Sequence, residues 1–302
     1  MSSVDKGIDT ASKYAEDIAQ WSRKGRELML SSVETLDDGR EPKEVAEQFF
    51  ERALRYDPTH QESLLFLTEL YLHSARGTLM TKRLTRLIRD YPEQFGPYRA
   101  IVACLRASGK IETAVHFFES RLKNSTEGKA NAHLCLAELY AILGDTASLQ
   151  AHCSALMDYA PVEPITQAQL FLEYNDANGI FSLAEKVEEL PIKHTLWGMM
   201  MEAQGDSQKA GEYFFSAASS EAPPWYALNA LANMWLQAKN IDYAQAYLEQ
   251  VEQMAGTTPE VLLTRMRMYK AKDLMDKAQA LQHRILQLNS CLPRTKRLAR
   301  QF

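Results

Sequence analysis

The seven histidines are the side chains best suited to metal binding or proton transfer, but their spacing fits neither role. They occur singly along the chain, as His60, His73, His116, His133, His152, His194 and His283. No HExxH pair or comparable metal-ligand spacing is present. In "HFFE", His116 and Glu119 lie one helical turn apart, as an ordinary surface pair would. The sequence therefore predicts no metal site.

Other signatures of catalysis and cofactor binding are also missing from the sequence. There is no GxxxxGK[ST] or GxGxxG loop to cradle phosphate groups and no GxSxG turn to present a nucleophile. The carboxylates are scattered over amphipathic segments, where most charges belong to solvated faces. We therefore expect a protein that is not an enzyme and that has no cofactor.

Basic side chains are concentrated between residues 76 and 110. This stretch holds eight Lys or Arg residues and two acidic ones, a local charge of +6, whereas the whole chain is at −5. An acidic protein segment or a phosphate group would be steered toward such a patch. The alternative is a solvated helix face without a ligand. The candidate patch consists of Lys82, Arg83, Arg86, Arg89, Arg99 and Arg106.

A second candidate site combines two amides with two basic side chains. Asn229 and Asn233 are four residues apart, and Arg267 and Lys270 follow on a later helical segment. An Asn amide both donates and accepts hydrogen bonds, as a peptide backbone requires. Arg can bind a carboxylate through two hydrogen bonds. These residues would suit an extended peptide that carries an acidic group, and the alternative is an exposed polar helix face.

The candidate residues lie on predicted helices that prolines separate at regular intervals. Three similar six-residue sequences end in a proline: "ALRYDP" at Pro58, "LIRDYP" at Pro92 and "LMDYAP" at Pro161. Later prolines recur at intervals of 30 to 36 residues, at Pro191, Pro223, Pro259 and Pro293. Each interval holds two segments with helical apolar periodicity. We predict that the proline closes the second helix, because it lacks an amide hydrogen and disfavours helix in the residue before it.

A short turn separates the two helices of each interval. The predicted turns are "SGK" at 108–110, "GD" at 144–145 and 205–206, "KN" at 239–240 and "KD" at 272–273. Glycine readily adopts the left-handed conformation that ends a helix. A helix pair of this kind cannot bury its apolar stripe alone, so the pairs are expected to stack.

The repeat resembles the tetratricopeptide repeat family over about residues 15–300. The family's second helix carries Ala, an aromatic residue, Ala and then Pro. That pattern is matched by Ala46, Phe50, Ala53 and Pro58, and by Ala210, Phe214 and Ala217, with Pro223 one residue late. The first-helix pattern is matched by Trp21, Gly25 and Leu28, by Leu136, Ala137 and Tyr140, by Trp197 and Gly198, and by Leu231, Ala232 and Trp235. Several matches in register make the resemblance specific.

The resemblance implies an all-α, right-handed solenoid of about eight antiparallel helix pairs. We expect a capping helix with an insertion in 1–42 and a first array in 43–161. A short atypical repeat in 162–191, whose second helix is cut by Pro191, could act as a hinge. A second array with a basic tail follows in 192–302, and the tail "PRTKRLARQF" is expected to be solvated.

The function implied by the resemblance is that of a non-catalytic scaffold or adaptor. It would present a concave groove to a peptide, a helix or a partner subunit, for instance in a larger complex or a secretion system. First helices face the groove in this family, which places Asn229, Asn233, Arg267 and Lys270 there. Self-association is a further option. Nucleic-acid or phosphate binding through 76–110 is the alternative, and the net charge of −5 disfavours it.

The sequence also suggests where the protein works. Cys104, Cys135, Cys153 and Cys291 have no CxxC spacing and lie among apolar residues, as buried free thiols do. We see no signal peptide at the N-terminus, and charges interrupt every apolar stretch well before 18 residues. A cytoplasmic protein without a membrane span is expected.

Overall fold

The computed structural model describes residues 13–30, 35–36, 39–255, 258–287 and 292–301. Within these ranges the chain forms 17 α-helices and no β-strand. It divides into two compact units, residues 1–135 and 136–302. The prediction of an all-α fold is confirmed.

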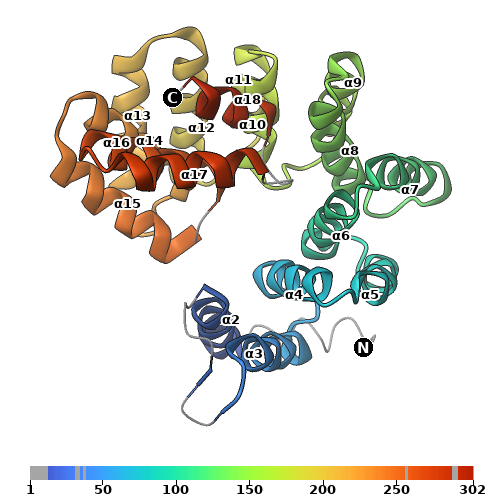
Figure 1. The fold of residues 1–302 in the computed structure, drawn as a ribbon. Coiled ribbons are helices and arrows are strands. Elements are labelled where there is room, and N and C mark those ends of the chain that lie inside the picture. The colour runs from blue at the N-terminus through green and yellow to red at the C-terminus, as the bar shows by residue number, and fades with distance from the viewer. Residues whose placement is uncertain (1–12, 31–34, 37–38, 256–257, 288–291, 302) are drawn as a thin grey trace. The chain divides into compact units, whose positions relative to one another are not determined.

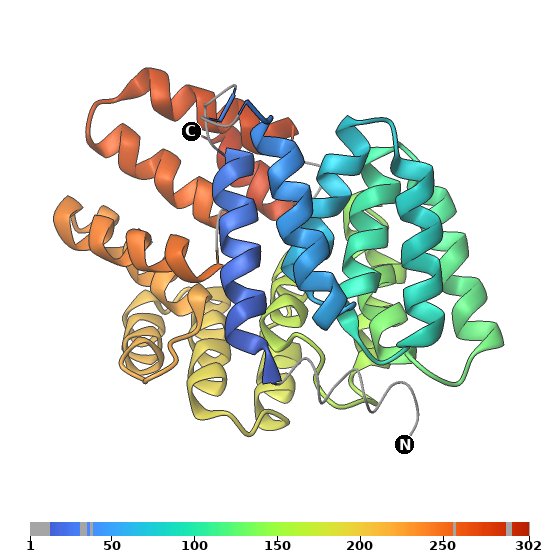
Figure 2. The ribbon, with the colours of Figure 1, turned by 90° about the horizontal axis from the view of Figure 1, so that it is seen from below.

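The first unit is a stack of helix pairs in which consecutive helices from α2 to α7 contact each other. Figure 2 shows α2 to α7 side by side, coloured from blue to teal. The division between the units falls inside α8. The helices are α2 (Ala15–Leu30), α3 (Pro42–Tyr56), α4 (Gln61–His73), α5 (Gly77–Asp90), α6 (Phe95–Ala107), α7 (Ile111–Asn124) and α8 (Lys129–Leu143).

The second unit continues the same alternation of first and second helices and ends in an additional helix. The first helices α10, α12, α14 and α16 contact one another in that order, and each second helix packs between them (Figure 1). Its helices are α9 (Thr146–Leu156), α10 (Pro164–Glu173), α11 (Ala177–Glu185), α12 (Leu190–Gln204), α13 (Ser207–Ala218), α14 (Trp225–Gln237), α15 (Ile241–Ala255), α16 (Pro259–Ala271), α17 (Met275–Gln287) and α18 (Pro293–Arg300).

Small residues let the two helices of a pair approach closely, as the repeat pattern predicts. A Cβ atom added at Gly25 would lie 2.6 Å from the ring of Phe50, and one added at Gly198 would lie 2.5 Å from the ring of Phe214. Both rings are buried. The space that each glycine leaves is therefore filled by the aromatic side chain of the following helix.

The predicted turns within the pairs are confirmed, and each contains a residue in the left-handed region. Glycine occupies it at Gly109, Gly144 and Gly205, with φ between 68° and 81°. Other residues adopt it in the remaining pairs, with φ of 58° or 59° at Ala75, Asn175, Lys239 and Asp273. These turns are thus built by the same backbone conformation whether or not a glycine is available.

The prolines do not all end helices, which corrects the prediction made from their spacing. Pro58 and Pro92 follow α3 and α5 as expected. Pro191, Pro259 and Pro293 instead occupy the first turn of α12, α16 and α18. Proline is favoured there, because the first amides of a helix have no partner within it. Pro191 therefore lies in the first turn of α12 and does not cut α11, which ends at Glu185.

The basic tail is a helix docked on one side and only partly solvated, which corrects the prediction of a solvated tail. Residues 293–300 form α18, which contacts α10, α16 and α17. Thr295 and Ala299, four residues apart, are both buried. Figure 1 shows α18 beside α10 and α17. The atypical repeat consists of the short helices α10 and α11, and a hinge at this place stays a prediction.

The cysteines behave as buried thiols in the described part of the chain. Cys104, Cys135 and Cys153 are buried and form no disulfide, and burial raises the pKa of Cys153 to about 12. Cys291 lies outside the described residues. None of the helices described is both long and apolar enough to cross a membrane.

Candidate functional site

Two adjoining recesses lie on the face that the first helices of the second unit form. We call this face the inner face; it is built from α10, α12, α14 and α16. The first recess, about 80 Å³ in volume, also has α18 in its wall. The second recess, about 500 Å³, opens beside it and shares Asn233 and Arg267 with it. All four residues predicted for the groove line one or both recesses: Asn229, Asn233, Arg267 and Lys270.

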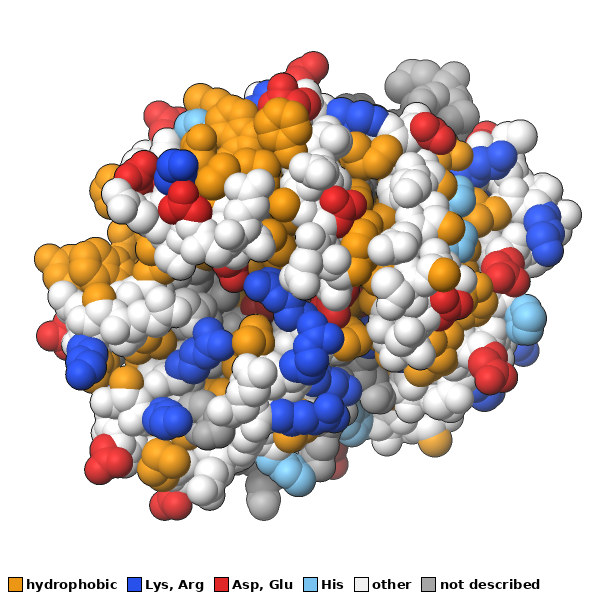
Figure 3. Space-filling view, turned by 90° about the horizontal axis from the view of Figure 1, so that it is seen from above, with side chains coloured by type: hydrophobic (Ala, Val, Ile, Leu, Met, Phe, Trp, Pro, Cys, Tyr) orange, Lys and Arg blue, Asp and Glu red, His pale blue; other side chains and the backbone are white. Residues whose placement is uncertain are grey.

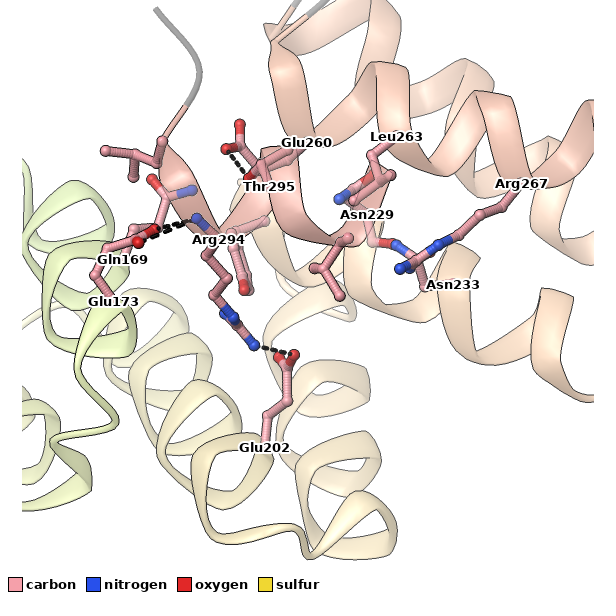
Figure 4. A pocket seen from close by; sticks show the side chains of 13 residues that line it. Gln169, Glu173, Glu202, Asn229, Asn233, Glu260, Leu263, Arg267, Arg294 and Thr295 are labelled. Atoms are coloured by element: carbon pink, nitrogen blue, oxygen red, sulfur yellow. Dashed lines mark hydrogen bonds and ion pairs between the residues drawn. The ribbon is translucent and has the colours of Figure 1, made fainter. Parts of the chain in front are cut away.

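The first recess is acidic, and its carboxylates bind the start of α18 (Figure 4). The backbone N–H of Arg294 donates to both oxygens of Glu173, at 3.1 and 3.0 Å. Its guanidinium Nη2 donates to Glu202 at 3.1 Å. The hydroxyl of Thr295 donates to Glu260, also at 3.1 Å. Three first helices thus each supply one carboxylate to the first turn of α18.

Burial shapes the electrostatics of this recess. It raises the pKa of Glu173, although the N–H of Arg294 and the charges of Arg297 and Arg294 act in the opposite direction. Burial also raises the pKa of Tyr226, although the guanidinium of Arg294 acts in the opposite direction. Charges and hydrogen bonds in such partly desolvated surroundings interact more strongly than they would in water.

One polar atom in the first recess has no hydrogen-bond partner among the described residues. Asn229 is buried, with 5% of its surface exposed. Its Oδ1 accepts no hydrogen bond from the described residues. Figure 4 shows Asn229 in the wall of the recess opposite α18. A buried acceptor without a donor is uncommon in folded proteins.

Asn233 orients Arg267 at the border between the two recesses. Its Nδ2 donates to the carbonyl oxygen of Asn229 at 3.0 Å and to Thr264 Oγ1 at 2.6 Å. Its Oδ1 accepts a hydrogen bond of 2.7 Å from Arg267 Nη1. Both amide hydrogens are therefore used within the chain, so Asn233 positions the guanidinium beside the second recess.

The second recess is basic at its rim and apolar beneath. Burial lowers the pKa of Arg267, and Lys270 is exposed one turn further along α16. The lining residues are Asn233, Leu236, Gln237, Lys239, Ile241, Arg267, Lys270 and Ala271. An acidic side chain with an apolar neighbour would find complementary groups there.

The architecture has counterparts among solved structures, whereas no protein-family model and no curated protein matches the sequence. A tetratricopeptide repeat protein from Parabacteroides merdae is similar with a TM-score of 0.50 and 15% identity, over 80% of this chain and 97% of that chain. The chain has a tetratricopeptide repeat fold. The structure of the APC/C hetero-tetramer Cut9–Hcn1 is also similar, with a TM-score of 0.45 and 14% identity, over 85% of this chain and 52% of that chain.

The basic stretch occupies α5 and α6 of the tetratricopeptide repeat fold, and only part of it faces solvent. Lys82, Arg86 and Arg89 are exposed on α5, where Arg86 and Arg89 both reach Asp90. The other three members are less accessible. Arg83 is bound to Glu51 at 2.6 Å, Arg99 is half-buried, and Arg106 is buried.

Sequence reasoning missed the residues that join α18 to the inner face. The carboxylates were expected to be solvated, but Glu173 is half-buried in the recess. The position of these carboxylates on first helices could have predicted their place in the recess, because the repeat pattern assigns first helices to the groove. Within the residues described, no three His, Cys, Asp or Glu side chains are grouped so that they could hold a metal ion.

Proposed function

We propose that the chain is a non-catalytic protein-interaction scaffold that binds a segment of a partner protein on the inner face of its second unit. The observation that carries this proposal is the second recess, which places Arg267 and Lys270 beside an apolar floor of Leu236 and Ile241. Helical-repeat folds of this kind bury their apolar stripes by stacking and leave a long face for ligands.

The chemistry of the second recess favours a segment with an acidic side chain. A guanidinium that is partly desolvated and held by Asn233 needs little reorganisation to bind a carboxylate. The apolar floor would receive an aliphatic or aromatic neighbour of that acidic residue. The partner is therefore expected to present an acidic–apolar segment.

Photo-crosslinking in the native host tests this proposal. A benzophenone amino acid at Gln237, which lines the second recess, should give crosslinks to one partner that mass spectrometry can identify. The same amino acid at Gln250, an exposed position of α15 outside the recess, is the matched control. Lys270→Glu should abolish the Gln237 crosslink, because it reverses a charge at the rim. Equal crosslinking at Gln237 and Gln250 would contradict the proposal.

The exposed basic residues of α5 support a second candidate surface, for an acidic segment or a phosphate group. The side chains of Arg86 and Arg89 are 76% and 73% exposed. If this surface carries the binding, Arg86→Glu with Arg89→Glu weakens the partner complex and Lys270→Glu does not. The binding should also fall steeply with added salt, because exposed charges are screened.

A further inference from the structure

The first recess recognises the start of a helix. The first amides of any helix lack partners within the helix and carry a partial positive charge. An N-cap side chain usually accepts from them, but the N-cap residue of α18 is Leu292, which forms no such bond. Glu173 supplies the acceptor from α10 instead. The recess therefore provides, from outside, the cap that the sequence of α18 lacks.

The recess also distinguishes the side chains of the helix that it holds. Glu202 binds a cation on the second residue of the helix, and Glu260 binds a hydroxyl on the third. The other basic residues of α18 include Arg297 and Arg300, which are exposed, and the charge of Arg297 also acts on Glu173. Figure 3 shows a row of Lys and Arg side chains across the middle of the face that it draws.

The fit of α18 in the recess is incomplete. The buried Oδ1 of Asn229 has no donor among the residues described, and Asn229 lines the same recess as Arg294 and Thr295 of α18. Another helix with a donor at this place would satisfy one more group than α18 does. At eight residues, α18 is also far shorter than a helix that is stable in water by itself. It therefore depends on the contacts of this site.

The geometry points to α18 as an internal ligand that a partner protein displaces. The partner supplies a helix with a basic residue at its second position and a hydroxyl at its third, as Arg294 and Thr295 do in α18. This inference rests on the proposed function, since both place a partner segment on the inner face. It concerns the acidic first recess, whereas the proposed function concerns the basic second one.

A peptide of residues 292–302 with a fluorescent label tests the exchange. It is titrated into the full chain and into the full chain with Arg294→Ala, which weakens the internal helix but keeps the three carboxylates of the recess. The internal competitor lowers the apparent affinity by the fraction of chains whose recess is filled. The Kd should therefore be about tenfold lower for the Arg294→Ala chain, as expected for the loss of one charge-assisted hydrogen bond.

Two controls belong to this titration. A peptide with Arg294→Ala should bind both chains about tenfold more weakly than the natural peptide, because it lacks the cation for Glu202. A chain with both Arg294→Ala and Glu202→Ala should lose the preference for the natural peptide. Equal affinity of the natural peptide for the wild-type and Arg294→Ala chains, or binding to neither, would overturn the inference.

A second measurement uses the wild-type chain, so that it does not depend on how a variant folds. Excess peptide should accelerate hydrogen exchange at the backbone amides of residues 296–300, because the displaced helix loses its cap. Unchanged exchange with the peptide bound would place the peptide elsewhere and overturn the inference. A dimer that exchanges α18 between two copies, detected by light scattering, would overturn the assignment to a different protein. Failure of the Gln237 crosslink alone would affect only the proposed function.

Discussion

The backbone N–H of Arg294 donates to both carboxylate oxygens of Glu173, a residue 121 positions earlier in the chain. The bond joins the second residue of α18 to the last residue of α10. It acts as a helix cap supplied by the tertiary structure, and it anchors a tail that the sequence alone suggests to be solvated. Its strength can be separated into the contribution of an acceptor and that of a charge.

Replacing Glu173 tests these two contributions. Because burial raises the pKa of Glu173 above its ordinary value, the stability that its protonated form contributes is lost as the pH rises through that raised pKa. A neutral acceptor should therefore suffice at pH 7. Glu173→Gln should leave the docking of α18 unchanged or firmer, whereas Glu173→Ala should weaken it by about 1 kcal/mol, the usual effect of losing a cap.

Hydrogen exchange at the amides of residues 296–300 measures this docking directly. Glu188→Ala, at an exposed position outside the helices, serves as the control and should leave exchange unchanged. Exchange in Glu173→Gln that is as fast as in Glu173→Ala, and faster than in the wild type, would show that the charge, and not the acceptor, holds the helix.

The contact between Gly198 and Phe214 should not tolerate an added methyl group. A Cβ at Gly198 would lie 2.5 Å from the ring, so the helices must separate or the ring must move. Gly198→Ala is expected to lower the free energy of unfolding by about 1–3 kcal/mol, which chemical denaturation can measure.

Gly211→Ala is the matched control for this substitution. A Cβ there would meet only the end of the flexible Met234 side chain, which can turn aside. Because alanine favours a helix over glycine by up to about 1 kcal/mol, Gly211→Ala should be neutral or stabilising. A similar loss of stability in both variants would contradict the close-approach explanation.

The left-handed turn between α4 and α5 offers a stabilising substitution. Ala75 has φ of 58°, a conformation that is strained for a residue with a Cβ and free of strain for glycine. Ala75→Gly should raise the free energy of unfolding by about 0.5–1 kcal/mol, seen as a higher urea midpoint. The same substitution at Ala147, exposed on α9, should lower it by about as much, because glycine disfavours a helix.

The pairing of Glu47 with Arg76 should make stability depend on pH. Two hydrogen bonds of 2.9 and 2.6 Å join them, and these bonds with Arg76 lower the pKa of Glu47. For a lowered carboxyl pKa, the contribution to stability is present above the ordinary value of 4.5 and is lost as the pH falls through the folded-state pKa.

Glu47→Gln should therefore cost about 0.5 kcal/mol at pH 7, a modest amount because the pair is partly solvated. The cost should shrink as the pH falls below 4.5. Urea denaturation of both proteins at neutral and acidic pH measures this difference. A cost that is the same at both pH values would show that the carboxylate charge contributes nothing.

Much of the helical architecture could be predicted because its causes are local. Apolar periodicity marks the helices. The left-handed turns at Gly109, Gly144 and Gly205 lie where short turn sequences interrupt that periodicity. The role of the prolines was harder to predict. Proline is compatible both with the end of one helix and with the first turn of the next, so spacing alone did not distinguish Pro58 from Pro259.

The candidate site could be predicted only in part. The repeat register was sufficient to place Asn229, Asn233, Arg267 and Lys270 on neighbouring first helices, and the structure brings them to adjoining recesses. It could not show that Asn233 uses its amide within the chain, because its partner Thr264 is 31 residues away. Side-chain hydrogen bonds of this kind depend on the packing of two helices.

By itself, the sequence determined the helices, their pairing and the face that the first helices share, because periodicity and turn conformation act over a few residues. Only the tertiary structure decided that Glu173, Glu202 and Glu260 would converge on α18. Their convergence depends on how four helix pairs stack, and no local pattern records that geometry. A basic tail next to scattered carboxylates became a docked helix because stacking brought the opposite charges together.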